Sequence, residues 1–238
     1  PLPINIFSML SQEPRQGSGE HISGGVGAHA VRSLAAVRTI DSIMTFGGEP
    51  LLYPEAVCKI HAAARDCGIP KRQLITNGYF TKDIQKIRDT AAELVWSGVN
   101  DILLSVDAFH QETIPVNAVK SFAEAVKAVK YKGVAIRVHP AWLVSETDEN
   151  PYNAKTRELI VEFAAMGIKA SGGNVIFPDG NALKYLKEYF APAAKYENPY
   201  TEDPNDMRTA SVSPDGSVLG GNIYDTDLAE LAERYCPQ

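Results

Sequence analysis

The 238-residue chain is 45% hydrophobic and 22% charged, which is typical of one compact domain or of a domain with a short extension. Its formal net charge of −6 argues against a protein that mainly binds nucleic acid, and no apolar stretch approaches the roughly 20 residues that span a bilayer. The chain opens Pro-Leu-Pro-Ile-Asn without basic residues, so we expect no signal peptide and a cytoplasmic protein.

Three cysteines occur, and their spacings match no zinc or disulfide framework. Cys58 and Cys67 fall in one helical pattern, where we expect them to be small core residues, and Cys236 lies near the end. This usage favours a reducing compartment.

Short β-rich runs alternate with longer helical patterns, as in βαβ units that build a parallel sheet. Strands are predicted at residues 3–8, 42–46, 73–76, 101–106, 134–140 and 173–177. The helices between them are predicted at residues 28–39, 54–67, 82–97, 116–131 and 153–166. Six strands are too few for a closed eight-stranded barrel, so we expect an α/β fold with a partial (β/α)6 TIM-like barrel over residues 1–180 and helices on its outer face.

Residues 181–238 read as a C-terminal extension. We expect a helix at 181–190, a loop or linker at 191–207, a hairpin at 211–219 and a terminal helix at 227–235. The hairpin is predicted to turn at Pro214-Asp215-Gly216, which has turn-favouring chemistry.

Strand parity indicates which face of the sheet carries chemistry. In the fourth strand, one face is apolar and the other becomes polar, with Ile102, Leu104 and Val106 opposite Leu103, Ser105 and Asp107. The fifth strand repeats this division, with Val134, Ile136 and Val138 opposite Arg137 and His139. A sheet covered by helices on one side only, with a polar concave face, has this pattern, and α/β barrels place active sites at the C-terminal strand ends.

The strongest motif follows the second strand and reads Gly47-Gly48-Glu49-Pro50. The glycines allow close approach of a ligand to the backbone, and Pro50 fixes the exit from the turn. The third strand ends Thr76-Asn77-Gly78, and the fourth continues into Ser105-Val106-Asp107. With these three strand ends, residues 3–177 resemble the core of the radical S-adenosylmethionine (SAM) enzymes.

The resemblance implies that Gly47, Gly48, Glu49 and Pro50 bind the amino group of SAM. It also implies that Thr76, Asn77, Ser105, Asp107 and Arg137 lie at the cofactor, an arginine suiting a carboxylate because its donors form a planar fork. His110, His139 and Trp142 are candidates to line the substrate space. Residues 212–223 resemble the start of the SPASM or twitch extension of radical SAM maturases, although only Cys236 is available there as a cluster ligand.

Each residue also has a purely structural interpretation. Asn77-Gly78 is an ordinary turn signal, Ser105 and Asp107 suit loop caps, and Arg137 suits an ion pair with Asp107 across the sheet. Histidines near strand ends often only pack or form hydrogen bonds.

The cluster ligands expected by the family are absent. A C-x3-C-x2-C triplet would hold a [4Fe–4S] cluster in the loop after the first strand, but residues 8–20 contain no cysteine. Two explanations stay open. A segment carrying the cysteines belongs just after Ser8 and is missing from this sequence, or the protein has lost the cluster. We therefore assign no metal-ligating residue in this sequence.

The leading hypothesis is therefore an iron–sulfur oxidoreductase that cleaves SAM reductively to a 5′-deoxyadenosyl radical and abstracts hydrogen from a small molecule or a peptide. Its expected cofactors are SAM and a [4Fe–4S] cluster, and its expected partner is an electron donor such as flavodoxin or ferredoxin, with neither nucleic acid nor membrane. The alternatives are a catalytically dead SAM-binding or scaffold protein, and a metal-free barrel lyase or isomerase that uses Glu49, Asp107 and His139.

Overall fold

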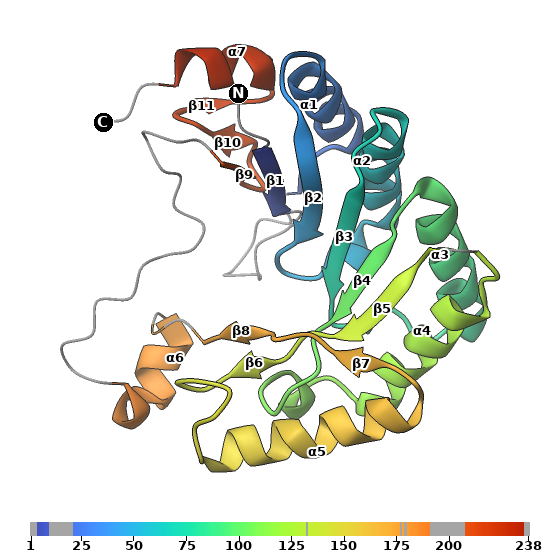
Figure 1. The fold of residues 1–238 in the computed structure, drawn as a ribbon, viewed down its shortest axis with the longest axis vertical. Coiled ribbons are helices and arrows are strands. Elements are labelled where there is room, and N and C mark those ends of the chain that lie inside the picture. The colour runs from blue at the N-terminus through green and yellow to red at the C-terminus, as the bar shows by residue number, and fades with distance from the viewer. Residues whose placement is uncertain are drawn as a thin grey trace.

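A curved seven-stranded parallel sheet organises the chain (Figure 1). The computed structural model describes residues 4–9, 21–131, 133–176, 178, 180–190 and 208–235. The strand order is β7-β5-β4-β3-β2-β1-β9. The strands are β1 Ile4–Met9, β2 Ile40–Phe46, β3 Lys71–Thr76, β4 Asp101–Leu104, β5 Ala135–Val138, β7 Lys169–Ala170 and β9 Thr209–Val212. The predicted partial α/β barrel is confirmed.

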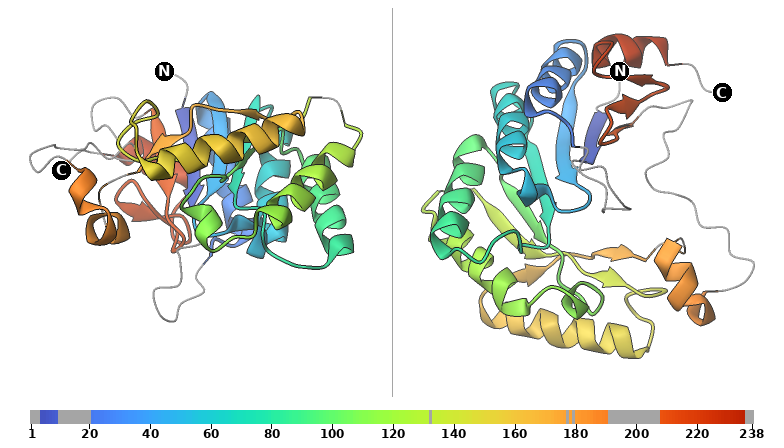
Figure 2. Two further views of the ribbon diagram at one scale, coloured as in Figure 1. Left: turned by 90° about the horizontal axis from the view of Figure 1, so that it is seen from below. Right: turned by 180° about the vertical axis from the view of Figure 1, so that it is seen from behind.

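Helices cover the convex side of this sheet, and none of the described helices forms a layer on its concave side (Figures 1 and 2). They follow one another around the outside in chain order, and neighbours such as α1 and α2 pack together. The covering helices are α1 Gly24–Val37, α2 Pro54–Asp66, α3 Ile84–Ser97, α4 Val116–Ala128 and α5 Pro151–Ala165.

The hydrophobic core lies between the helices and the convex face of the sheet. The strand residues that point outward are fully or almost fully buried, namely Ile43, Leu74, Ile102, Leu104 and Val138. Burial of one such side chain contributes about 1.5–3 kcal/mol. The predicted parity is confirmed for this apolar face, while Leu103 on the other face is also buried.

The prediction of residues 173–177 as the sixth strand of the main sheet is wrong. The main sheet takes β7, whereas residues near 173–177 form β8 (Asn174–Val175), which pairs with β6 (Ala141–Trp142) in a separate two-stranded sheet. The two glycines between β7 and β8 turn the chain away from the main sheet. Gly173 has φ 71°, and a Cβ there would lie 2.1 Å from the carbonyl oxygen of Pro140, so only glycine fits.

The C-terminal part returns to the N-terminal edge of the barrel. β9 pairs in parallel with β1, and β10 (Ser217–Val218) pairs antiparallel with β11 (Gly221–Asn222). The turn at 214–216 is confirmed, since Gly216 N donates to Ser213 O at 2.8 Å. The predicted hairpin over 211–219 is confirmed next to its turn, where Ser213 N donates to Ser217 O at 2.9 Å, but beyond the turn β9 pairs with β1 and β10 pairs with β11. Helix α7 (Leu228–Arg234) packs on α1, where His29 Nε2 lies 2.5 Å from Asp227 Oδ1.

The predicted helix at 181–190 divides into α6 (Gly180–Tyr185) and a 3-10 turn, η3 (Lys187–Tyr189). A second apolar cluster holds it at the barrel rim, where Leu143, Leu186 and Phe190 are buried. The predicted linker at 191–207 lies outside the described residues.

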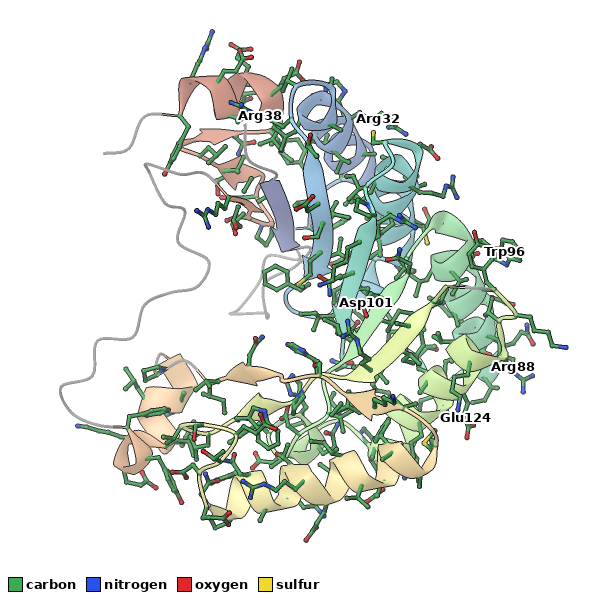
Figure 3. All side chains as sticks on the ribbon, in the orientation of Figure 1. Arg32, Arg38, Arg88, Trp96, Asp101 and Glu124 are labelled. Carbon is green, nitrogen blue, oxygen red and sulfur yellow. The ribbon has the colours of Figure 1, made fainter. Side chains whose placement is uncertain are left out.

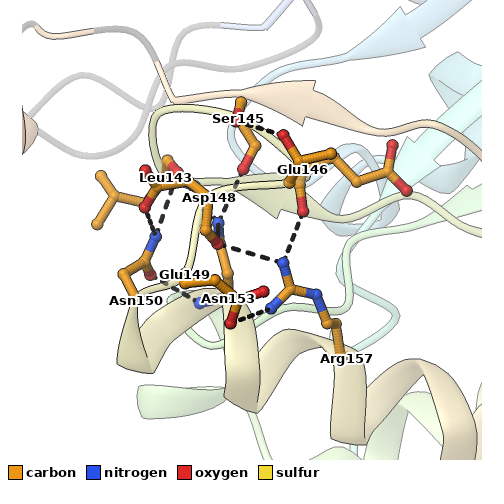
Figure 4. A network of polar contacts seen from close by, with 9 residues as sticks. Leu143, Ser145, Glu146, Asp148, Glu149, Asn150, Asn153 and Arg157 are labelled. Atoms are coloured by element: carbon orange, nitrogen blue, oxygen red, sulfur yellow. Dashed lines mark hydrogen bonds and ion pairs between the residues drawn. The ribbon is translucent and has the colours of Figure 1, made fainter.

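The loop between β6 and α5 is fastened by one buried asparagine (Figure 4). Asn153 accepts a hydrogen bond from Leu143 N at 2.9 Å and donates to the carbonyl oxygens of Leu143, Ser145 and Asp148. Arg157 donates to the carbonyl of Glu146 at 2.7 Å. These hydrogen bonds satisfy the loop carbonyls and tie the loop after β6 to α5. Within the described residues, no helix has the length and apolarity to cross a membrane.

Candidate functional site

The turn after β2 places a buried carboxylate at the C-terminal end of the sheet. Gly47 and Gly48 both have positive φ, 89° and 48°, which glycine adopts without strain. Glu49 then caps the 3-10 helix η1 (Pro50–Leu52), and its Oε1 accepts from Leu51 N at 2.8 Å. Pro50 is buried at the first position of η1.

Glu49 is also bonded to the end of β3. Thr76 Oγ1 donates to Oε1 at 2.6 Å, and Asn77 N donates to Oε2 at 2.8 Å. The Asn77 side chain accepts from Tyr79 N at 2.8 Å, so it forms the turn that its sequence suggested. The first two motifs are therefore one hydrogen-bonded unit centred on Glu49.

The charge of Glu49 is only partly compensated. The side chain is 7% exposed, and burial raises its pKa above the usual value, opposed by the hydrogen bonds from Thr76, Leu51 and Asn77 and by the nearby His110. Among the described residues, no lysine or arginine pairs with it. A carboxylate has about four acceptor positions, and three are occupied here, so one position remains for a further donor such as an ammonium group.

A cavity of about 350 Å³ lies at the C-terminal strand ends, next to this unit. The described residues that line it come from the ends of β2, β3, β4 and β5, from the loop after β4, and from β6 and β8. Eight of the predicted site residues line it: Gly47, Gly48, Thr76, Asn77, Ser105, Asp107, His110 and His139. Four do not: Glu49, which is hydrogen-bonded to the lining residues Thr76 and Asn77, and Pro50, Arg137 and Trp142. A cavity of this size suits a small-molecule ligand.

Asp107 holds the cavity wall together. It is fully buried, and its oxygens accept from the backbone N–H groups of Phe109, His110 and Ala141 at 2.9–3.0 Å. His110 Nδ1 lies 2.8 Å from Oδ2. Since both oxygens are engaged, Asp107 orients His110 and joins the loop after β4 to the start of β6.

We expect Asp107→Asn to lower the free energy of unfolding by about 1–2 kcal/mol, because an amide nitrogen would face an N–H donor at one of the two oxygen positions. Chemical denaturation measures the loss. The matched change Asp66→Asn, at an exposed carboxylate on α2, should alter the same quantity by less than about 0.5 kcal/mol. Equal effects of the two changes would contradict the role given to Asp107.

The remaining candidates have definite partners. Arg137 pairs with Asp101, its Nε lying 3.2 Å from Oδ1, so the suggested ion pair with Asp107 is wrong. Trp142 is buried, and its Nε1 donates to Gly172 O at 2.7 Å, away from the lining. His139 Nδ1 lies 2.8 Å from Ser171 Oγ.

Sequence reasoning missed one part of the cavity, the connection from β7 to β8. Ser171 follows β7 and holds His139, and Asn174 lines the cavity. The signal was the pair Gly172-Gly173 directly after a short strand, which matches the Gly-Gly turn after β2.

The two cysteines in the described part of the chain, Cys58 and Cys67, do not fit an iron–sulfur cluster. Cys58 is half-buried against the core and burial raises its pKa, as expected for a packing residue. Cys67 is exposed at the end of α2, so its prediction as a core residue is wrong. The described residues contain no group of three or more histidine, cysteine or acidic side chains able to hold a metal, and residues 10–20 and Cys236 lie outside them. The described side chains therefore do not fit an iron–sulfur cluster at the cavity.

Comparisons with known proteins show which solved structures have a similar fold. No family model matches the chain, and no curated protein is similar in sequence. The solved structure of anSMEcpe with bound AdoMet and the Cp18Cys peptide has a TM-score of 0.55 at 16% identity, covering 98% of this chain and 80% of that one. The structure of anSMEcpe with AdoMet gives 0.53 at 16% identity, covering 97% and 81%.

The complex of BtrN with AdoMet and 2-DOIA is also similar, with a TM-score of 0.48 at 13% identity, covering 97% of this chain and 82% of that one. At sequence identities this low, the similarity shows a shared fold and no more. The chain has an α/β partial-barrel fold that it shares with anSMEcpe.

Proposed function

We propose that the cavity at the C-terminal strand ends binds S-adenosylmethionine, and that the chain is the core of a radical SAM enzyme. The observation that carries the proposal is Glu49, a buried carboxylate beside the cavity with an open acceptor position and no cationic side chain among its described partners. The ammonium of the SAM methionine would supply the missing positive charge, and a charge-assisted hydrogen bond of this kind is strong.

Two further observations support this proposal. Gly47 and Gly48 line the cavity and leave it open to the backbone, while Ser105 supplies a hydroxyl from the end of β4. In addition, anSMEcpe is a radical SAM enzyme with a similar fold, and its solved structure contains bound AdoMet.

The radical reaction itself depends on cluster ligands that the described residues do not provide. We therefore assign to this chain the binding and orientation of SAM, and we assign the cluster to a cysteine segment that belongs just after Ser8 in the natural protein. Loss of the cluster would instead leave a SAM-binding protein without this chemistry.

Calorimetric titration of SAM into the 238-residue chain tests the binding site. We expect saturable binding of one SAM per chain, with a rise in the melting temperature because the ligand binds only the folded state. If millimolar SAM gives neither a heat of binding nor a rise in the melting temperature, the proposal is wrong.

A separate measurement tests the cluster. The protein expressed from its complete gene should have a mass above that of the 238-residue chain, contain about one [4Fe–4S] cluster after anaerobic reconstitution and release 5′-deoxyadenosine from SAM on reduction. A mass equal to that of the chain, together with no iron, would favour the SAM-binding protein without radical chemistry.

A further inference from the structure

The concave face of the sheet carries charges one layer below the cavity. Arg137 on β5 and Lys169 on β7 are register partners on neighbouring strands, so their side chains share a face. That face is the concave one, because two residues further along the same strands Ser171 and His139 meet by a hydrogen bond and His139 lines the cavity.

A charged layer is unusual at this position. The interior layers of α/β barrels are filled mainly by branched apolar side chains. Here Asp101, at the start of β4, accepts from Gln73 at 2.7 Å and from Arg137, and it lies on the inner side of the sheet (Figure 3). In the same view Arg88, Trp96 and Glu124 lie on the outer helical layer.

The two cations are not fully compensated. Arg137 donates to Asp101 from Nε and Nη2, while its Nη1 has no partner among the described residues, and its side chain is still 37% exposed. Lys169 is exposed, and its side chain has no ion pair or hydrogen bond within the described part of the chain. Like charges on adjacent strands destabilise a sheet, and one carboxylate leaves this pair with an excess positive charge.

We propose that Arg137 and Lys169 form a subsite for an anionic oxygen group, a carboxylate or a phosphate, of the substrate that enters the barrel. Because Asp101 occupies Nε and Nη2 of Arg137, the open Nη1 donates a charge-assisted hydrogen bond to either group, and Lys169 adds a second positive charge. The subsite lies two residues, about 7 Å, along the strands from His139, so a substrate held there reaches the cavity with its other end.

This anion is not the carboxylate of SAM bound at Glu49. Asp101, which holds the guanidinium of Arg137, is the register partner of Gln73, whereas Glu49 is bonded to Asn77. Arg137 itself is level with Ile75 through Leu103, two residues or about 7 Å from Asn77, and its guanidinium extends further from Asn77 toward Asp101. The level of Asp101 is four residues, or about 13 Å, from Asn77, which is more than the ammonium and carboxylate of one amino acid span. The inference is also independent of SAM binding, since it concerns a different layer of the barrel.

The subsite is tested in the absence of SAM with inorganic phosphate and with acetate, each titrated at constant ionic strength set with chloride. The readouts are the NMR signal of the His139 ring and the melting temperature. We expect saturable changes in both, and the ion that binds more tightly identifies the class of the anionic group. Binding to Lys169→Gln should be about tenfold weaker or more, which is about 1.4 kcal/mol.

Lys155→Gln on the outer face of α5 is the matched control, because this lysine is exposed and pairs only with Glu158. It should bind both ions as the unchanged protein does. Unchanged binding in Lys169→Gln, or equal weakening in the two variants, would overturn the subsite. If SAM displaces phosphate competitively and Lys169→Gln weakens SAM binding equally, the anion is the cofactor's carboxylate and the substrate assignment is wrong.

Discussion

Glu49→Gln should weaken SAM binding by roughly ten- to hundredfold, since a charge-assisted hydrogen bond contributes about 1.5–3 kcal/mol. The substitution keeps the shape of the side chain and removes the charge that the ammonium requires. Calorimetric titration of SAM into the two proteins measures the change. Unchanged affinity would show that Glu49 serves only the turn.

Thermal unfolding of the same variant separates the binding role from the structural one. Glu49 accepts from Leu51, Thr76 and Asn77, and glutamine loses one of these bonds because its amide nitrogen meets an N–H donor. Glutamine also avoids the cost of burying a charge, so the two effects offset each other and the melting temperature should change little. A large drop with unchanged SAM affinity would defeat the assignment.

The pH dependence of SAM binding adds a second check on Glu49. Burial raises the pKa of Glu49, and only its ionised form attracts an ammonium. SAM affinity should therefore fall as the pH is lowered toward this raised pKa. In Glu49→Gln that part of the pH dependence should be absent.

Acid should destabilise the protein through His61, a fully buried histidine on α2. Its Nε2 lies 2.9 Å from Thr45 Oγ1, which in turn donates to Gln73 O at 3.5 Å, while its Nδ1 has no partner among the described residues. Burial, with a smaller contribution from Arg72, lowers the pKa of His61 from 6.5 to about 3. The folded protein therefore holds this ring neutral.

The direction of this pH effect on the free energy of unfolding follows from proton linkage. Between about pH 3 and 6.5 the unfolded chain binds a proton at this histidine and the folded chain does not, so the free energy of unfolding falls as the pH falls. The expected loss from this residue is about 2 kcal/mol at pH 5 relative to pH 8, from 1.36 kcal/mol per pKa unit.

Denaturant unfolding at pH 8 and pH 5 measures this loss in the unchanged protein and in His61→Gln. Glutamine carries no titrating group and its amide can still donate to Thr45. The variant should be less stable at pH 8, but its stability should fall by about 2 kcal/mol less on acidification. Equal losses in the two proteins would contradict the buried neutral state of His61.

The sequence predicted the parts of the site where strands are long and end in turn signals. The Gly-Gly turn after β2 and the Thr-Asn-Gly end of β3 could be located because each follows a clear β-rich run. The strand β7 has only two residues, Lys169 and Ala170, so periodicity could not identify it, and Ser171 was missed with it.

The partner of Arg137 could not be predicted because parity identifies a shared face and leaves the register open. In the structure Arg137 pairs in register with Leu103, so Asp101 and Ser105 lie one layer to either side on the same face of β4. The guanidinium bonds to Asp101, toward the N-terminal end of the sheet. Similarly, β9 was predicted as part of a local hairpin, because a parallel partner about 200 residues away leaves no local signal.

The pairing of β9 with β1 also sets an order of events during synthesis. β1 can pair with β2 as soon as residues 40–46 leave the ribosome, but its other edge has no strand partner until residues 209–212 are made. Ribosomes add about 5–20 residues per second, so that edge waits on the order of ten seconds or more. An unpaired strand edge is a template for aggregation, and non-local pairing is slow to form. The nascent chain therefore carries an unpaired β1 edge until β9 is made.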